Sequence, residues 1–203
     1  PPYAYQLFYF YANVQQLNAL RRSRGMHSFD IRPHAGEAGS PLHLVTTYLP
    51  ARGINHGINL DKEAALQYLY YLDQVGIAVS PMSNNALFLK LKDSPFLRFF
   101  NRGLNVSLSS DDPMMFHLSE QPLMEEYSNA RQYWNLNMID LSEIARNSVL
   151  QSGFDHKCKL EWLGDSYESE GIAGNDPDKT NLPQIRMGFR SEELQSERSL
   201  LAR

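Results

Sequence analysis

Short apolar runs alternate with amphipathic segments through the first half of the chain. Four runs are aliphatic or β-branched and are bounded by Gly, Pro or Asn, a pattern typical of short strands; they lie at 29–33, 52–56, 76–80 and 104–108. The segments between them favour helices and lie at 40–50, 61–75 and 94–102. Because strand and helix alternate, the pattern predicts parallel βα units.

The pattern is helical on both sides of this region. An aromatic-rich helix is predicted at about 4–23, with Gly25 as its stop. After the fourth strand only helices are predicted, at 120–136, 141–153 and 156–163. The tail from residue 166 is rich in Gly, Asp, Asn and Pro, which predicts a loop followed by a terminal helix over 191–200.

Four βα units are compatible with two architectures. They make half of an eightfold (β/α)8 barrel, which typically needs about 250 residues, or they make an open doubly wound sheet. Neither G-x-G-x-x-G nor G-x-x-x-x-G-K occurs in the sequence. A nucleotide-phosphate loop of either kind is therefore not predicted.

The composition restricts the classes of partner that the protein can bind, but it says little about which reaction the protein catalyses. The 203 residues suffice for one sizeable core, and the net charge of -4 predicts no basic face for nucleic acid. No apolar run approaches the roughly 20 residues that a membrane helix needs. The single cysteine, Cys158, is expected on a helix surface and suits a reducing compartment, so a cytoplasmic location is expected.

Polar residues cluster after the predicted strands rather than before them. In a βα barrel the carboxyl ends of the strands form one face, and active sites lie there. Taken singly, each cluster has an ordinary explanation, such as a hydrogen-bonded core histidine, a turn, or an Asp-Pro helix start. Taken together they predict one site, formed by His34 with Glu37, His56, Ser83 to Asn85, and Asp111 with Asp112.

Convergent imidazole and carboxylate side chains suggest a zinc centre. Zinc makes a bound water reactive near neutral pH. A further histidine and a glutamate can then move protons to and from the substrate. The hypothesis requires His34 and Asp111 to reach a single ion, since metal–ligand bonds are only about 2 Å long.

At these residues the sequence resembles the adenosine/AMP deaminase family. The stretches that carry the likeness include RPHAGEAG, INHGINL, RGLNVSLSSDDPMMFHL and GIAGNDPDKTNLPQIRMGFR. HAGE, HG and DDP are shared across the family, whereas the part from ARNSV to QIRM resembles its AMP-specific branch. The resemblance implies hydrolysis of AMP to IMP and ammonia, with zinc as cofactor, on a metal-dependent (β/α)8 TIM barrel. Four βα units at 1–118 and post-barrel helices at 119–203 would form the second half of that barrel domain.

The resemblance also implies a role for each residue that matches a family motif. His34 and Asp111 match zinc ligands, and His56 matches the histidine that holds and deprotonates the water. Glu37 matches the acid that protonates N1 of the purine ring, and Asp112 matches the carboxylate that binds the purine.

The residues after the DDP motif match the substrate-lining loop, which covers Pro113, Met114 and Met115. Position 115 commonly carries Gln in the AMP-specific branch, so the methionine here departs from that pattern.

One family motif is missing from the sequence. The first barrel strand of the family carries His-x-His, which supplies two further zinc ligands, and no such pair occurs among the six histidines of this chain. The family's phosphate-contacting segment is also absent. We therefore expect the isolated chain to bind zinc weakly and to turn over nothing. The resemblance also implies that the full-length protein is a homo-oligomer, a dimer or tetramer.

Three other functions compete with this hypothesis. An adenosine deaminase would act on the nucleoside, a non-catalytic homologue would only bind nucleotides, and another barrel hydrolase would cleave a different bond. Of the remaining histidines, His43 and His117 are assigned structural roles beside the site, and His27 and His156 are expected on the surface.

Overall fold

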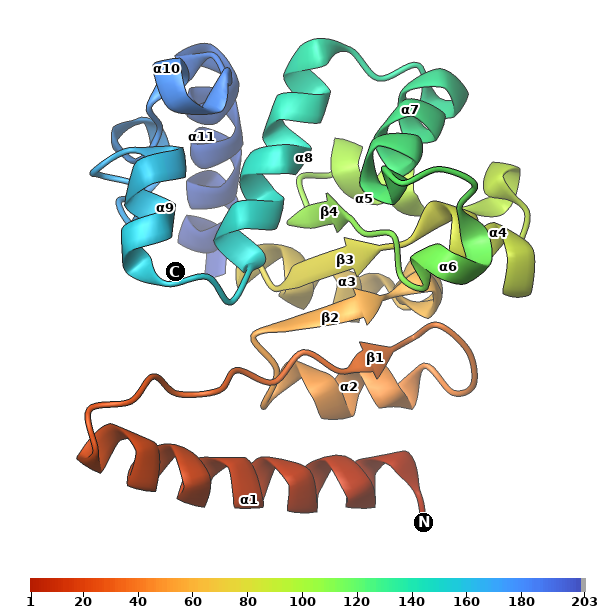
Figure 1. Cartoon of the computed structure of the whole chain (residues 1–203), viewed down its shortest axis with the longest axis vertical. Coiled ribbons are helices and arrows are strands. Elements are labelled where there is room, and N and C mark those ends of the chain that lie inside the picture. The colour runs from red at the N-terminus through yellow and green to blue at the C-terminus, as the bar shows by residue number, and fades with distance from the viewer. Residues whose placement is uncertain (202–203) are drawn as a thin grey trace.

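A parallel four-stranded sheet organises the computed structural model, which describes residues 1–201 (Figure 1). The strands pair in chain order: β1 (His34–Ala35), β2 (Gly53–His56), β3 (Gly76–Val79) and β4 (Val106–Leu108). Ala35 is in register with His56, and Val79 with Leu108. All four carboxyl ends therefore lie along the same edge of the sheet.

Helices follow each strand, and several more follow the last one. The βα region contains α1 (Tyr3–Ser23), α2 (Leu42–Tyr48), α3 (Ala64–Leu72), α4 (Pro81–Leu87), α5 (Phe96–Asn101) and α6 (Pro113–Phe116). The later helices are α7 (Pro122–Trp134), α8 (Met138–Gln151), α9 (His156–Leu163), α10 (Pro177–Thr180) and α11 (Gln184–Leu201). Short 3₁₀ turns lie at Ile58–Lys62, Leu91–Asp93 and Gly171–Gly174. Figure 1 shows α4 and α6 beyond the arrowheads of the strands and α9 and α11 toward their opposite ends.

The core lies between the sheet and its covering helices. Ile54, Ile77 and Val106 come from three neighbouring strands and are almost completely buried. Phe96 and Phe99 of α5 belong to the same cluster. Burying such side chains stabilises the fold by roughly 1.5–3 kcal/mol each, so the packing against these helices holds the strands in place.

The first strand differs from its prediction. Residues 29–33 are extended but are not assigned to the sheet, and β1 is only His34–Ala35. Pro33 has no N–H to donate, and the segment contributes carbonyls instead: Ile31 O accepts from Arg52 N and Pro33 O from Asn55 N. The extended segment thus guides the chain alongside β2 without forming a regular ladder.

The tail also differs from its prediction. The sequence predicted a loop and a helix over 191–200, whereas α11 begins at Gln184 and η3 and α10 precede it. Gly188 is buried within α11, and a Cβ there would lie 3.1 Å from Ile172 Cδ1. This glycine therefore permits close packing instead of ending the helix.

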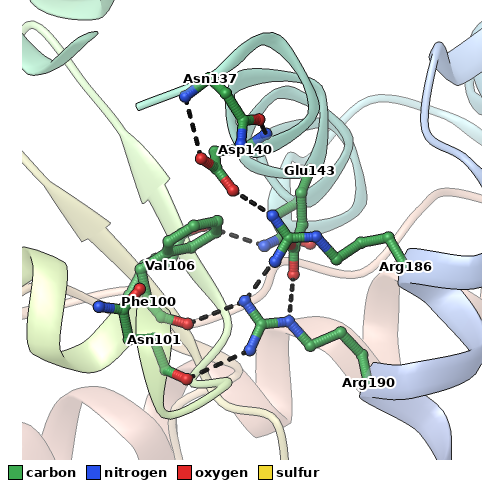
Figure 2. A network of polar contacts seen from close by, with 9 residues as sticks. Phe100, Asn101, Val106, Asn137, Asp140, Glu143, Arg186 and Arg190 are labelled. Carbon is green, nitrogen blue, oxygen red and sulfur yellow. Dashed lines mark hydrogen bonds and ion pairs between the residues drawn. The ribbon is translucent and has the colours of Figure 1, made fainter. Parts of the chain in front are cut away.

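A network of charges joins α11 to α8 (Figure 2). Arg190 Nε donates to Glu143 Oε1 at 2.7 Å, and its Nη2 donates to Phe100 O at 3.0 Å. Arg186 pairs with Asp140 and lies 3.4 Å from the other oxygen of Glu143. These guanidinium groups contact both α8 and the end of α5. They therefore hold α11 against these two helices.

Two further features concern the edges of the sheet and the hydropathy of the helices. β1 and β4 form the two edges of the described sheet. Among the described helices, none combines the length and the hydropathy required to span a lipid bilayer.

Replacing Glu143 by Gln should lower the free energy of unfolding by about 1.5–3 kcal/mol, because it removes the charge that strengthens the hydrogen bonds from Arg190 and the ion pair with Arg186. Urea titration followed by circular dichroism measures this change. Glu192→Gln on the exposed side of α11 is the matched control and should be neutral. Equal effects of the two variants would contradict the role given to the network.

Candidate active site

Three side chains from separate strand ends converge at the carboxyl edge of the sheet. His34 lies in β1, His56 ends β2, and Asp111 follows β4. Each offers one ligand atom, and these atoms lie within 4.8 Å of one another. One divalent metal ion could contact all three, so the two residues that the sequence predicted as ligands are brought together with a third.

The backbone takes uncommon conformations at two of these residues. His56 has φ of 72° and Asp111 has φ of 54°. Residues other than glycine rarely adopt positive φ, which costs about 1–3 kcal/mol and is concentrated at functional sites. These positive φ values occur at the last residue of β2 and three residues after β4, where both side chains face the shared point.

Glu37 completes the group from the loop after β1. Its Oε2 lies 3.5 Å from His34 Nδ1, and its Oε1 lies 3.4 Å from His56 Nε2. Gly36 has φ of +70°, and a Cβ at this position would lie 2.9 Å from Leu44 Cδ2. The small residues between His34 and Glu37 therefore let the loop fold tightly enough for both side chains to face the same space.

Two residues of the first turn of α4, which follows β3, contact this group. The amide Nδ2 of Asn84 lies 3.0 Å from His56 Nδ1, and Ser83 Oγ donates to Asp111 Oδ2 at 2.7 Å. Both side chains are buried. Because Nδ1 of His56 is paired with Asn84, the other ring nitrogen, Nε2, is the one that faces Glu37 and Asp111.

His56 is 1 % exposed, and its environment sets its protonation. Burial lowers the pKa of His56 below its ordinary value, and His34 adds to this, while Glu37 and Asp111 act in the opposite direction. The imidazole is therefore neutral at neutral pH, which is the form that ligates a metal or accepts a proton. Within residues 1–201 its Nε2 is buried without a hydrogen-bond partner.

The remaining predicted residues lie at the rim. Asp112 is the N-cap of α6, yet its side chain makes no capping hydrogen bond. Asp112, Pro113, Met114 and Met115 are all exposed. This segment lies over the carboxyl edge of the sheet and is available to a ligand there.

The other four histidines lie outside the group of three. His43 stacks on Tyr3 with ring centroids 4.4 Å apart, and His117 is buried against Glu126. His27 and His156 are exposed, as predicted.

The sequence did not assign roles to three residues that contact the group. Ser83 and Asn84 lie in a cluster that it noted after the third strand, so their position was the available signal. Tyr3, whose hydroxyl donates to His34 O at 2.7 Å, gave no such signal because it precedes His34 by 31 residues.

A second candidate lies elsewhere in the described chain. A cavity of about 1050 Å³ lies among α3, α8 and α11 near Asn105 and Glu143. Its charged lining residues include existing ion pairs, such as Arg190 with Glu143 and Arg198 with Glu170. The strand ends are the better candidate for catalysis, because they combine strained backbone with a buried imidazole whose Nε2 has no hydrogen-bond partner within residues 1–201.

Comparison with known proteins identifies the family. The model of the AMP deaminase family matches residues 1–203. This chain belongs to the AMP deaminase family. The chain is 56% identical over 202 residues to AMP deaminase 3 of Homo sapiens and 54% identical over 201 residues to AMP deaminase of Saccharomyces cerevisiae. These alignments include 100% and 99% of this chain but only 26% and 25% of the two relatives.

Solved structures of other proteins share the fold of this chain. An adenine deaminase from Arthrobacter aurescens matches with a TM-score of 0.60 at 23% identity, over 71% of this chain and 44% of that one. An amidohydrolase from Burkhoderia ambifaria with bound Zn matches with a TM-score of 0.58 at 17% identity, over 86% and 44%. The neighbours are TIM-barrel proteins, so the parallel sheet corresponds to part of such a barrel.

We predict that Asp111→Asn weakens binding of a divalent cation by at least about 10-fold, since it removes a charged ligand. Zn²⁺ is the probe, and competition with a chromophoric chelator measures its affinity. Asp112→Asn, one residue further on and exposed, is the control and should keep the wild-type affinity. The opposite ranking would exclude Asp111 as a ligand.

Proposed function

We propose that this chain is the C-terminal part of a zinc-dependent AMP deaminase, which converts AMP and water to IMP and ammonia in cytoplasmic purine nucleotide interconversion. The observation that carries the proposal is the convergence of His34, His56 and Asp111 around one point with Glu37 beside them. Membership of the AMP deaminase family supplies the substrate class.

His34 and Asp111 are the residues that would hold zinc. Imidazole and carboxylate are ligands that zinc prefers, and the buried Nε2 of His56 faces the same space. When bound, zinc would make a water molecule acidic enough to react at neutral pH. Ser83 would keep Asp111 in its ligating orientation through the 2.7 Å hydrogen bond.

Glu37 and His56 would move the protons. The carboxyl group of Glu37 would protonate N1 of the purine ring, which makes C6 more electrophilic. Neutral His56 would take a proton from the attacking water at Nε2 in the tautomer whose ring proton is on Nδ1. This tautomer requires Asn84 to turn its amide oxygen, in place of the Nδ2 that lies 3.0 Å away, toward Nδ1. As the C6–O bond forms and the C6–N bond breaks, the proton taken by His56 would leave with the amino group as ammonia. The remaining hydroxyl proton would return to Glu37, while N1 keeps the proton that Glu37 donated.

Asp112 and the following loop would bind the substrate. The Asp112 carboxylate makes no hydrogen bond within the described residues and is exposed at the rim, where it would contact the purine ring. Pro113, Met114 and Met115 would line the same side of the pocket. The methionine at position 115 would contribute apolar contact in place of a hydrogen bond.

The complete site would require residues outside these 203. The chain spans about a quarter of the length of the relatives it matches, and it has no His-x-His pair. We propose that residues 1–118 form the second half of the barrel and 119–203 the post-barrel helices. Exposed aromatic residues on α1, including Phe8 and Phe10, support contacts with the preceding half or with another subunit of a homo-oligomer.

The full-length protein that contains this chain should deaminate AMP with zinc bound, whereas the isolated chain should show no turnover, because two ligands are too few for a catalytic zinc site. Ultraviolet absorbance during the conversion of AMP to IMP measures both rates. Activity in the isolated chain would contradict this expectation. Faster turnover of adenosine than of AMP would instead favour a nucleoside deaminase, and nucleotide binding without turnover a non-catalytic homologue.

In the full-length protein, Glu37→Gln should lower kcat for AMP by about 10²–10⁴-fold, since an amide cannot donate the proton that N1 requires. Glu63→Gln, an exposed carboxylate just before α3, is the matched control and should retain the wild-type rate. A Glu37→Gln rate within twofold of wild type, taken at several pH values, would remove Glu37 from the mechanism.

A further inference from the structure

A buried pair of titratable side chains lies behind the candidate active site. His117 Nε2 and Glu126 Oε1 are 3.1 Å apart, and both side chains are 0% exposed. His117 follows α6 directly, and Glu126 lies in the middle of α7. Burying such groups is costly unless they are paired and hydrogen-bonded, so this pair requires an explanation.

The Glu126 carboxylate also contacts a third element. The backbone N–H of Met82 lies 3.3 Å from each of its oxygens. Met82 is the second residue of α4, where a backbone N–H has no partner inside the helix. One carboxylate from α7 therefore joins the beginning of α4 to the end of α6.

The two elements that Glu126 joins carry the residues of the candidate site. Ser83 and Asn84 follow Met82 directly and contact Asp111 and His56. On the other side, the segment from Asp111 to Phe116 is held between β4 and the anchored His117. A shift of either segment would therefore alter the 2.7 Å contact between Ser83 and Asp111.

We infer that Glu126 and His117 are positioning residues, which hold the start of α4 and the Asp111–Phe116 segment in register across the active site. The inference rests on the proposed function for its catalytic readout. Neither residue is among the group of three possible ligands, and neither side chain contacts His34 or Glu37 in the described structure. The pair would act through Ser83 and Asp111 rather than on the substrate.

The protonation of Glu126 is compatible with this role. Burial raises the pKa of Glu126 to about 7, aided by Glu125 and Asp111, while the hydrogen bond from Met82 opposes the rise. The hydrogen bonds, rather than a full negative charge, thus hold the two segments near neutral pH. A glutamine at this position, which is neutral and of the same shape, should keep those hydrogen bonds.

Three variants of the full-length protein test the inference: Glu126→Leu, Glu126→Gln and, as the structural control, Glu143→Gln in the α8–α11 network. Glu126→Leu should lower kcat for AMP by at least about 10-fold with a smaller change in KM, as loss of a residue that supports metal ligands does. Glu126→Gln should restore kcat to within about threefold. Glu143→Gln should lower Tm without lowering kcat, because it destabilises the fold away from the site.

Two kinetic outcomes would overturn the inference. One is a wild-type kcat in folded Glu126→Leu. The other is a Glu126→Gln variant as impaired as Glu126→Leu, which would indicate a role for the charge itself. If Glu126→Leu does not fold, His117→Phe replaces it, because the ring keeps its volume but loses the pairing, and the same expected and contrary outcomes apply.

A structural readout separates this inference from the proposed function. In a crystal structure of the folded apolar variant, Ser83 Oγ should lie beyond hydrogen-bond distance of Asp111 Oδ2, a contact that is 2.7 Å long with Glu126 present. An unchanged contact would overturn the positioning role whatever the activity. A wild-type protein that does not deaminate AMP would overturn the proposed function alone.

Discussion

The parallel register of four short strands is the constraint on which the candidate site depends. Parallel pairing puts the carboxyl end of every strand at one edge. The pairing of Ala35 with His56 sets the register of β1 against β2. Residues that are 77 positions apart in the chain, such as His34 and Asp111, can then share one ligand-sized space. The buried aliphatic residues of the strands and the aromatic residues of α5 hold this register, so packing in the core decides geometry at the rim.

The site adds local strain to this global constraint. His56 and Asp111 both have positive φ, a conformation that persists only where the surroundings enforce it. Asn84 and Ser83 supply part of that enforcement through hydrogen bonds to the two side chains. The start of α4 therefore contributes no predicted ligand, yet it orients one candidate base and one candidate ligand.

The helices after β4 have two separable tasks. α7 reaches the site through Glu126, which links the turns that follow β3 and β4. α11 instead packs on α8 through Arg186 and Arg190, toward the other end of the strands (Figure 2). Titratable side chains occur in both regions. Of the two, only the pair of His117 and Glu126 lies between segments that carry site residues.

The sequence by itself determined the family, the βα order and the candidate residues at the strand ends, because strand period, glycine placement and the HAGE and DDP motifs are local properties. It misplaced the first strand, since Pro33 at the end of the 29–33 run has no N–H for a ladder, and the paired residues are His34 and Ala35 instead. It also read Gly188 as part of a loop, where contact with Ile172 makes a glycine useful inside a helix. Only the tertiary structure decided the roles of Tyr3, Asn84 and Glu126, because hydrogen bonds between residues distant in the chain depend on how the elements pack and leave no local pattern.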